Sequence, residues 1–67
     1  MWTEGLQQQT REFFKNMNGA FMKHSGDSRF GFCILLEGKY VIRDRESDDK
    51  WEYDSVDEFL EDGWAID

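Results

Sequence analysis

The chain has 67 residues, of which 34% are charged, and it carries a formal net charge of −7 with no proline and one cysteine. A chain of this length forms one small domain with a lean core, and a single cysteine excludes an internal disulfide. Residues 1–43 carry six Lys and Arg against four Asp and Glu, whereas residues 44–67 carry two against eleven. Phosphate backbones bind mainly through cations, so direct nucleic-acid binding is not expected.

The N-terminal residues do not have the pattern of a secretory signal. The segment 1–15 lacks a basic start and an apolar centre. No apolar run in the sequence approaches the roughly 20 residues that span a bilayer. We therefore expect a cytoplasmic protein that does not enter a membrane.

An amphipathic helix is predicted near the N-terminus. Thr3 is a suitable N-cap, and a stripe at three- and four-residue spacing follows it, made of Leu6, Thr10, Phe13, Met17 and Phe21. The Asn18-Gly19 pair allows two outcomes: the helix ends near residue 17, or it continues to about His24. Continuation is preferred because Phe21 keeps the stripe, with Gly26 as the stop signal.

Residues 30–36 and 40–42 are rich in aromatic and branched apolar residues, and they are predicted to form a β-hairpin. The intervening Glu37-Gly38 suits a tight turn and allows two registers. A two-residue loop places Leu35 opposite Tyr40, whereas a three-residue loop places Leu36 opposite Tyr40. The second is preferred, because it gathers one apolar core face from Phe30, Phe32, Ile34, Leu36, Tyr40 and Ile42.

The other side of this hairpin is also apolar. In the preferred register, Cys33 and Leu35 point away from the core face, and Val41 lies on the same candidate surface. We expect these three residues to form an apolar interface for a protein partner or a second copy. A weak homodimer built on this side is therefore predicted.

Residues 50–54 are predicted to form a third strand with Trp51 and Tyr53 on its buried face. Ser55-Val-Asp-Glu58 matches a capping box, so a short helix follows, and Gly63 suits its left-handed end. Residues 64–66 then form a terminal strand or a packed segment. The predicted fold is a single α+β domain over residues 1–67, with an N-terminal helix, a three-stranded antiparallel meander, a short C-terminal helix and a terminal segment.

This order of elements resembles the layout of double-stranded-RNA-binding domains. The resemblance is one of fold layout, which does not by itself imply function. Those domains contact phosphates, often with basic residues at the start of the second helix, whereas the helix here starts with Ser55-Val-Asp-Glu58. The function of that family is therefore not carried over.

The sequence contains no complete catalytic or metal-binding motif. A calcium loop counted from Asp44 has Asp49 at its sixth position and Ser55 at its twelfth, where Gly and Glu are required. The single histidine, His24, has no neighbouring residue that would tune it for acid–base chemistry, and it is expected to be a cation at a helix end. We expect no enzymatic activity, no metal and no cofactor.

Two functions fit this sequence. The first is a small acidic, non-enzymatic protein-binding or regulatory module that acts through apolar surface. The alternative is an acidic mimic of nucleic acid, of the type found in phages and mobile elements, that inhibits a nucleic-acid-binding protein. The candidate acidic surface consists of Asp48, Asp49, Glu52, Asp57, Glu58, Glu61 and Asp62.

Overall fold

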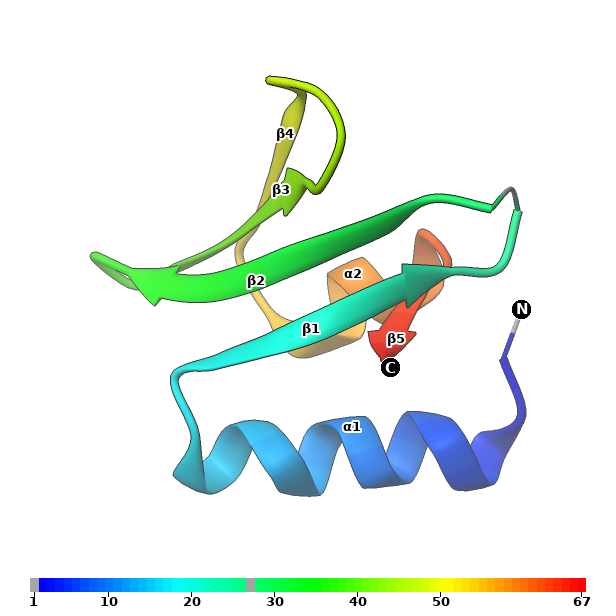
Figure 1. Cartoon of the computed structure of the whole chain (residues 1–67). Coiled ribbons are helices and arrows are strands. Elements are labelled where there is room, and N and C mark those ends of the chain that lie inside the picture. Colours follow the sequence, from blue (N-terminus) through cyan, green and yellow to red (C-terminus); the bar gives the residue numbers. More distant parts are fainter. Residues whose placement is uncertain (1, 27) are drawn as a thin grey trace.

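The computed structural model describes residues 2–26 and 28–67, and over these residues it has two helices and one five-stranded antiparallel sheet (Figure 1). The strands lie side by side in the order β4-β3-β2-β1-β5. The predicted α+β domain is confirmed, but the sheet has two strands more than the predicted meander. In chain order the elements are α1 (Glu4–Asn16), β1 (Gly19–His24), β2 (Phe30–Leu36), β3 (Lys39–Asp44), β4 (Lys50–Tyr53), α2 (Val56–Glu61) and β5 (Trp64–Ile66).

The segment expected to continue the first helix is strand β1. α1 begins after Thr3, whose hydroxyl accepts a hydrogen bond from the Leu6 N–H at 3.3 Å, and it ends at Asn16. β1 then pairs antiparallel with β2, which places Phe21 opposite Phe32. Glycine disfavours a helix interior, and pairing with β2 on one side and with β5 on the other supplies hydrogen-bond partners for the backbone of this segment. Continuation of the helix to His24 is therefore wrong, and His24 does not lie at the end of the first helix.

The β2–β3 hairpin has a two-residue turn. Glu37 and Gly38 both have positive φ, at 51° and 79°, which is the combination found in type I′ turns. Leu35 lies opposite Tyr40, and Cys33 lies opposite Ile42. The preferred three-residue loop is therefore wrong. A difference of one residue in register exchanges the two faces of a strand, so the face of β2 that was expected to be buried is the other one.

The core lies on the face of the sheet that meets α2, which we call the inner face. The small residues Ala20, Gly31 and Cys33 of β1 and β2 lie on this face. Aromatic side chains from the two helices and from β3, β4 and β5 fill the rest of the core. The Phe59 ring of α2 lies 5.5 Å from the Phe14 ring of α1 and 5.7 Å from the Tyr40 ring. A Cβ added to Gly31 would lie 2.8 Å from Ile42 Cγ2 and 3.4 Å from the Trp64 ring. Close packing therefore requires glycine at position 31.

The last strand closes the sheet against the first helix. β5 pairs with β1 and places Trp64 opposite His24, which confirms a terminal strand among the two predicted options. The Ile66 N–H donates to Thr10 Oγ1 at 3.3 Å, and Trp2 Nε1 donates to the Gly63 carbonyl at 2.8 Å. α1 therefore runs beside the β5 edge, as Figure 1 shows. Neither helix in the described ranges is long and apolar enough to cross a bilayer.

The assignment of the two faces predicts unequal effects of two phenylalanine truncations. Phe59→Ala should lower the free energy of unfolding by about 3–5 kcal/mol, because Phe59 is fully buried among aromatic rings. Phe21→Ala should lower it by less than about 1 kcal/mol, because that side chain is 59% exposed. Urea denaturation followed by tryptophan fluorescence measures both, and equal losses would contradict the assignment.

Candidate functional site

The face of the sheet turned away from α2 is called the outer face. Side chains alternate along a strand, so it receives every second side chain of β1 to β4. Figure 1 shows α2 behind β1 and β2, with no helix in front of them. The outer face carries Phe21 and Lys23 from β1, Phe30, Phe32, Ile34 and Leu36 from β2, Lys39, Val41 and Arg43 from β3, and Lys50 and Glu52 from β4.

The large apolar side chains of the outer face are exposed to solvent. Phe21 is 59% exposed, Leu36 55%, Phe30 43% and Phe32 39%, whereas Cys33 on the inner face of the same strand is fully buried. Contiguous exposed apolar patches of this kind mark interaction sites in soluble domains. The outer face is therefore the candidate docking surface.

One end of the outer face combines phenylalanine with positive charge. We call it the basic end. A row across the strands runs from Lys50 through Arg43 and Phe32 to Phe21. The rings of Phe21 and Phe32 meet edge to face at 5.1 Å, and the Arg45 guanidinium lies 5.7 Å from the centre of the Phe21 ring. The basic end consists of Phe21, Phe30, Phe32, Arg43, Arg45 and Lys50.

The other end of the outer face is aliphatic. Ile34 lies opposite Val41, and Leu36 lies opposite Lys39. The Lys39 ammonium forms an ion pair with Asp54, which raises the pKa of Lys39. The apolar surface therefore extends along the full length of β2, and it is not confined to the phenylalanines.

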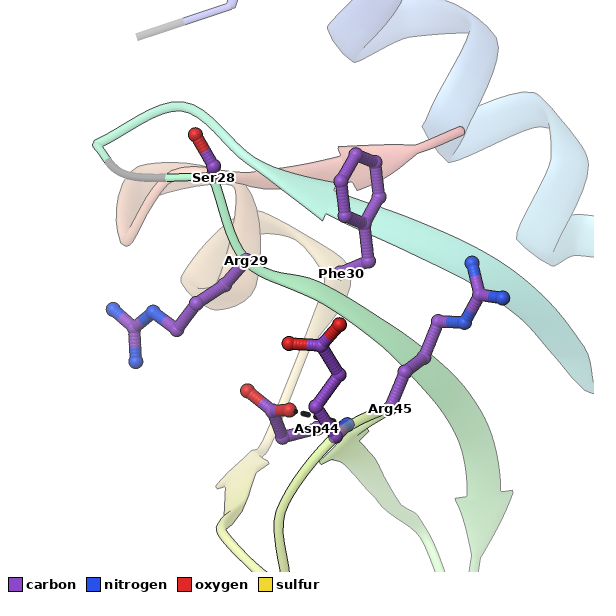
Figure 2. A pocket seen from close by; sticks show the side chains of 6 residues that line it. Ser28, Arg29, Phe30, Asp44 and Arg45 are labelled. Atoms are coloured by element: carbon purple, nitrogen blue, oxygen red, sulfur yellow. Dashed lines mark hydrogen bonds between the residues drawn. The ribbon is translucent and has the colours of Figure 1, made fainter.

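A pocket of about 350 Å³ adjoins the basic end, between the β1–β2 loop and the β3–β4 turn. Figure 2 shows the side chains of Arg29 and Arg45 pointing in opposite directions at this pocket. Arg29 lies over the Trp51 ring at 4.8 Å, whereas Arg45 reaches the outer face. Phe30 belongs both to the pocket and to the basic end, so the outer face continues into this hollow. The lining residues are Ser28, Arg29, Phe30, Asp44, Arg45 and Glu46.

The structure does not bring the predicted apolar interface together. Cys33 is buried on the inner face, so its assignment to an interface is wrong. Leu35 also belongs to the inner side, at the end of β2 where it stays 38% exposed, and Val41 is half-buried on the outer face. The cause is the two-residue turn, which turns Cys33 and Leu35 towards the helices. Of the residues that were expected in the core, Phe30, Phe32 and Leu36 are exposed on the outer face, and Ile34 is half-buried there.

The predicted acidic surface is divided into separate places. Asp48 and Asp49 lie in the turn before β4, and Glu52 lies on the outer face. The remaining members lie on or directly after α2, where they form a compact acidic group. Two of these α2 carboxylates have partners: Arg11 Nε donates to Asp57 at 2.8 Å, and the Tyr53 hydroxyl donates to Asp62 at 2.5 Å.

The environment of His24 is that of a structural residue. Its Nε2 lies 2.7 Å from the Asp62 carbonyl oxygen, and the Gly26 N–H donates to its Nδ1 at 3.0 Å. The ring also packs edge-on against Trp64, with centroids 4.9 Å apart. His24 therefore joins the end of β1 to the end of α2. Within the described ranges, no cluster of three or more His, Cys, Asp or Glu side chains is placed to hold a metal.

Two signals in the sequence point to the outer face. Glu37-Gly38 is a two-residue hairpin turn, and the two-residue register places Cys33 opposite Ile42, where the three-residue register would have placed Ile34. Gly31 alternates with Cys33 and marks a close approach by another part of the chain. The large side chains of the opposite face of β2, which carries Phe30 and Phe32, favoured burial of that face in the sequence-based prediction. Side-chain size alone, however, does not show which face of a strand is buried.

No protein-family model matches the chain, and no curated protein or solved structure gives a significant match. The functional interpretation therefore depends on the geometry of the molecule.

The buried position of Cys33 predicts an unreactive thiol. Burial raises the pKa of this thiol to about 12, and a thiol reacts through its thiolate. Native protein at pH 8 should react with a thiol reagent such as dithionitrobenzoate far more slowly than protein unfolded in guanidinium. Rapid labelling of the folded protein, at a rate similar to that of the unfolded chain, would contradict the inward orientation of Cys33.

The same burial predicts a loss of stability at alkaline pH. The unfolded thiol ionises near pH 8.5, whereas Cys33 in the fold stays neutral to about pH 12. Its contribution to stability is therefore fully present below pH 8.5 and is lost as the pH rises towards 12, by up to about 1.4 kcal/mol per pH unit. Burial and the hydrogen bond to Asp62 also raise the pKa of Tyr53. Cys33→Ala and Tyr53→Phe should each flatten the decline measured by urea denaturation between pH 8 and 11.

Proposed function

We propose that the protein is a small non-enzymatic module that binds a protein partner through its outer face. The observation that supports this most directly is the exposure of four large apolar side chains of β1 and β2 while the opposite face of the same sheet is closed. A sheet normally buries its apolar faces against another layer of structure. The outer face lacks such a layer within the described residues, and a partner would supply it.

The inner core is well packed without any contribution from the outer face. Phe59, Trp64, Met22 and Ile42 are buried almost completely, and no buried side-chain nitrogen or oxygen in the described ranges lacks a hydrogen-bond partner. The exposed phenylalanines are therefore not a consequence of a poorly formed core. A role in association would explain their place on the surface, because aromatic residues, phenylalanine included, are enriched at protein–protein interfaces.

A role in binding without catalysis, metal or cofactor is part of this proposal. It includes a cytoplasmic location, which agrees with an unpaired and buried Cys33. The predicted weak homodimer stays a prediction. If it forms, the outer face and not Cys33 and Leu35 would make the contact.

The acidic mimic is the second candidate function, and the carboxylates of α2 support it. Four exposed carboxylates lie within the six residues 57–62, namely Asp57, Glu58, Glu61 and Asp62. Against this, Asp57 is paired with Arg11 and Asp62 accepts from Tyr53. The mimic also leaves the exposed phenylalanines unexplained, so it is the less favoured function.

Two variants separate the two candidates. Phe21→Ser with Phe32→Ser removes apolar area from the outer face, and Glu58→Gln with Glu61→Gln removes charge from α2. Each variant and the wild-type protein would be used to capture partners from lysate of the source organism, after circular dichroism has shown that all three are folded. The proposal predicts that the main bound protein is lost by about tenfold or more with the serine variant only.

The reverse result, with loss in the glutamine variant only, would favour the acidic mimic. Binding by the mimic should also fall steeply between low and moderate salt. A partner that is retained by both variants would contradict both functions.

A further inference from the structure

We infer that the partner meets the outer face with an acidic amphipathic helix, whose carboxylates lie over the basic end and whose apolar stripe covers β2. This inference rests on the proposed function and specifies the chemistry of the partner. It begins from an unfavourable arrangement of charge. Arg43 and Lys50 lie directly opposite each other on β3 and β4, and like charges in such cross-strand pairs are destabilising.

The side chains of Arg43 and Lys50 form no ion pair with any residue that the structure describes. Both side chains are exposed, and they lie in the same cross-strand row as Phe32, which is directly opposite Arg43. The other three cations of the outer face are already engaged, since Lys39 is paired with Asp54, Arg45 lies over the Phe21 ring and Lys23 lies over the Trp2 ring. A carboxylate placed between Arg43 and Lys50 would relieve their repulsion and would add to the apolar contact with Phe32.

The charge of the outer face as a whole is opposite to that of the molecule. It is +4, from five cations and one carboxylate, and the chain carries −7. The rest of the chain therefore carries −11. The face attracts anionic surfaces although the protein is acidic. Its charged residues are Lys23, Lys39, Arg43, Arg45, Lys50 and Glu52.

A second copy fits this surface less well than an acidic partner does. Symmetric contact between two outer faces brings two surfaces of +4 together, and like charges at an interface suppress association. Contact between the outer face of one copy and α2 of another is favourable in charge. It places the apolar stripe against exposed carboxylates of α2, and a head-to-tail contact of this kind forms rings or open filaments.

Single-stranded nucleic acid also fits this surface less well. Bases bind by stacking on open aromatic faces, but Arg45 lies over the Phe21 ring and Phe32 packs edge to face against it. The aliphatic end, with Ile34 and Leu36, would have no role in such binding. A protein segment uses both the apolar stripe and the cations.

The geometry of the sheet favours a helix as the segment. Helix α2 already covers the inner face, and a helix on the outer face would complete a layered arrangement. Addition of a strand is limited, because the open edge is β4, which has four residues and carries the charged Lys50 and Glu52. A helix of about 18 residues is about 27 Å long, which matches the 29 × 28 Å breadth of the molecule.

Three synthetic helical peptides of about 18 residues test this inference. All share one Leu and Phe stripe at i, i+3, i+4 and i+7 spacing, and their flanking positions carry Glu, Gln or Lys. Fluorescence anisotropy would measure the binding of each to the wild-type protein. We expect the Glu peptide to bind about tenfold tighter than the Gln peptide in 50 mM salt and the Lys peptide to bind weakest, with the difference reduced in 300 mM salt.

Two variants test separately how the charge and the apolar side chains of the outer face contribute to peptide binding. R43E/K50E should reverse the order, so that the Lys peptide binds best, and F32S should weaken all three peptides. As a control, K15E makes a single charge reversal on α1, which is half the change in net charge of R43E/K50E, and it should leave the order unchanged. Circular dichroism would confirm that each variant is folded.

The remaining outcomes separate this inference from the proposed function. Equal binding of all three peptides, weakened by F32S, would retain the docking surface and overturn the acidic partner. Binding of none of the peptides would overturn the helix. A dimer in sedimentation velocity that F32S abolishes would assign the face to a second copy, and tight F32S-sensitive binding of oligothymidine would assign it to nucleic acid; both results overturn this inference.

Discussion

The two-residue turn at Glu37-Gly38 is the constraint on which the rest of the structure depends. Positive φ at both positions produces a type I′ geometry, whose twist matches that of the paired strands. This geometry sets Cys33 beside Ile42. Since alternate side chains of a strand point to opposite faces, the turn places Cys33 on the same face as Ile42 and Phe32 on the other face with Arg43.

The inner face has small residues at Ala20, Gly31 and Cys33, because aromatic side chains from the helices and from β3, β4 and β5 supply most of the bulk of the core. Ala20 and Cys33 are buried beneath aromatic side chains of α1, α2 and β5, and Gly31 lies where a Cβ would collide with Ile42. A core in a chain of 67 residues is filled by a few large rings. The phenylalanines of β2 therefore do not contribute to the core. They form part of the outer face, to which we assign binding.

Charge follows the same division between the two faces. Arg43, Arg45 and Lys50 surround the exposed rings, whereas the carboxylates of α2 lie on the opposite side of the sheet. A single net charge describes neither surface, because interactions between exposed charges are screened beyond about a Debye length, which is about 8 Å at physiological salt. In the proposed function, the local field of the outer face, and not the net charge of the chain, would select the partner.

The sequence by itself determined those features of the fold that depend on residues close together in the chain. They are the caps at Thr3 and Ser55, the left-handed Gly63, and the alternation of the apolar Trp51 and Tyr53 with charged residues. It did not determine β1, which becomes a strand because β2 and β5 pair with it on either side. Nor did it determine which face of the hairpin is exposed. Both faces of β2 are apolar, so the choice was made by contacts with α1, α2 and β5, which are distant in the chain and meet only in the folded structure.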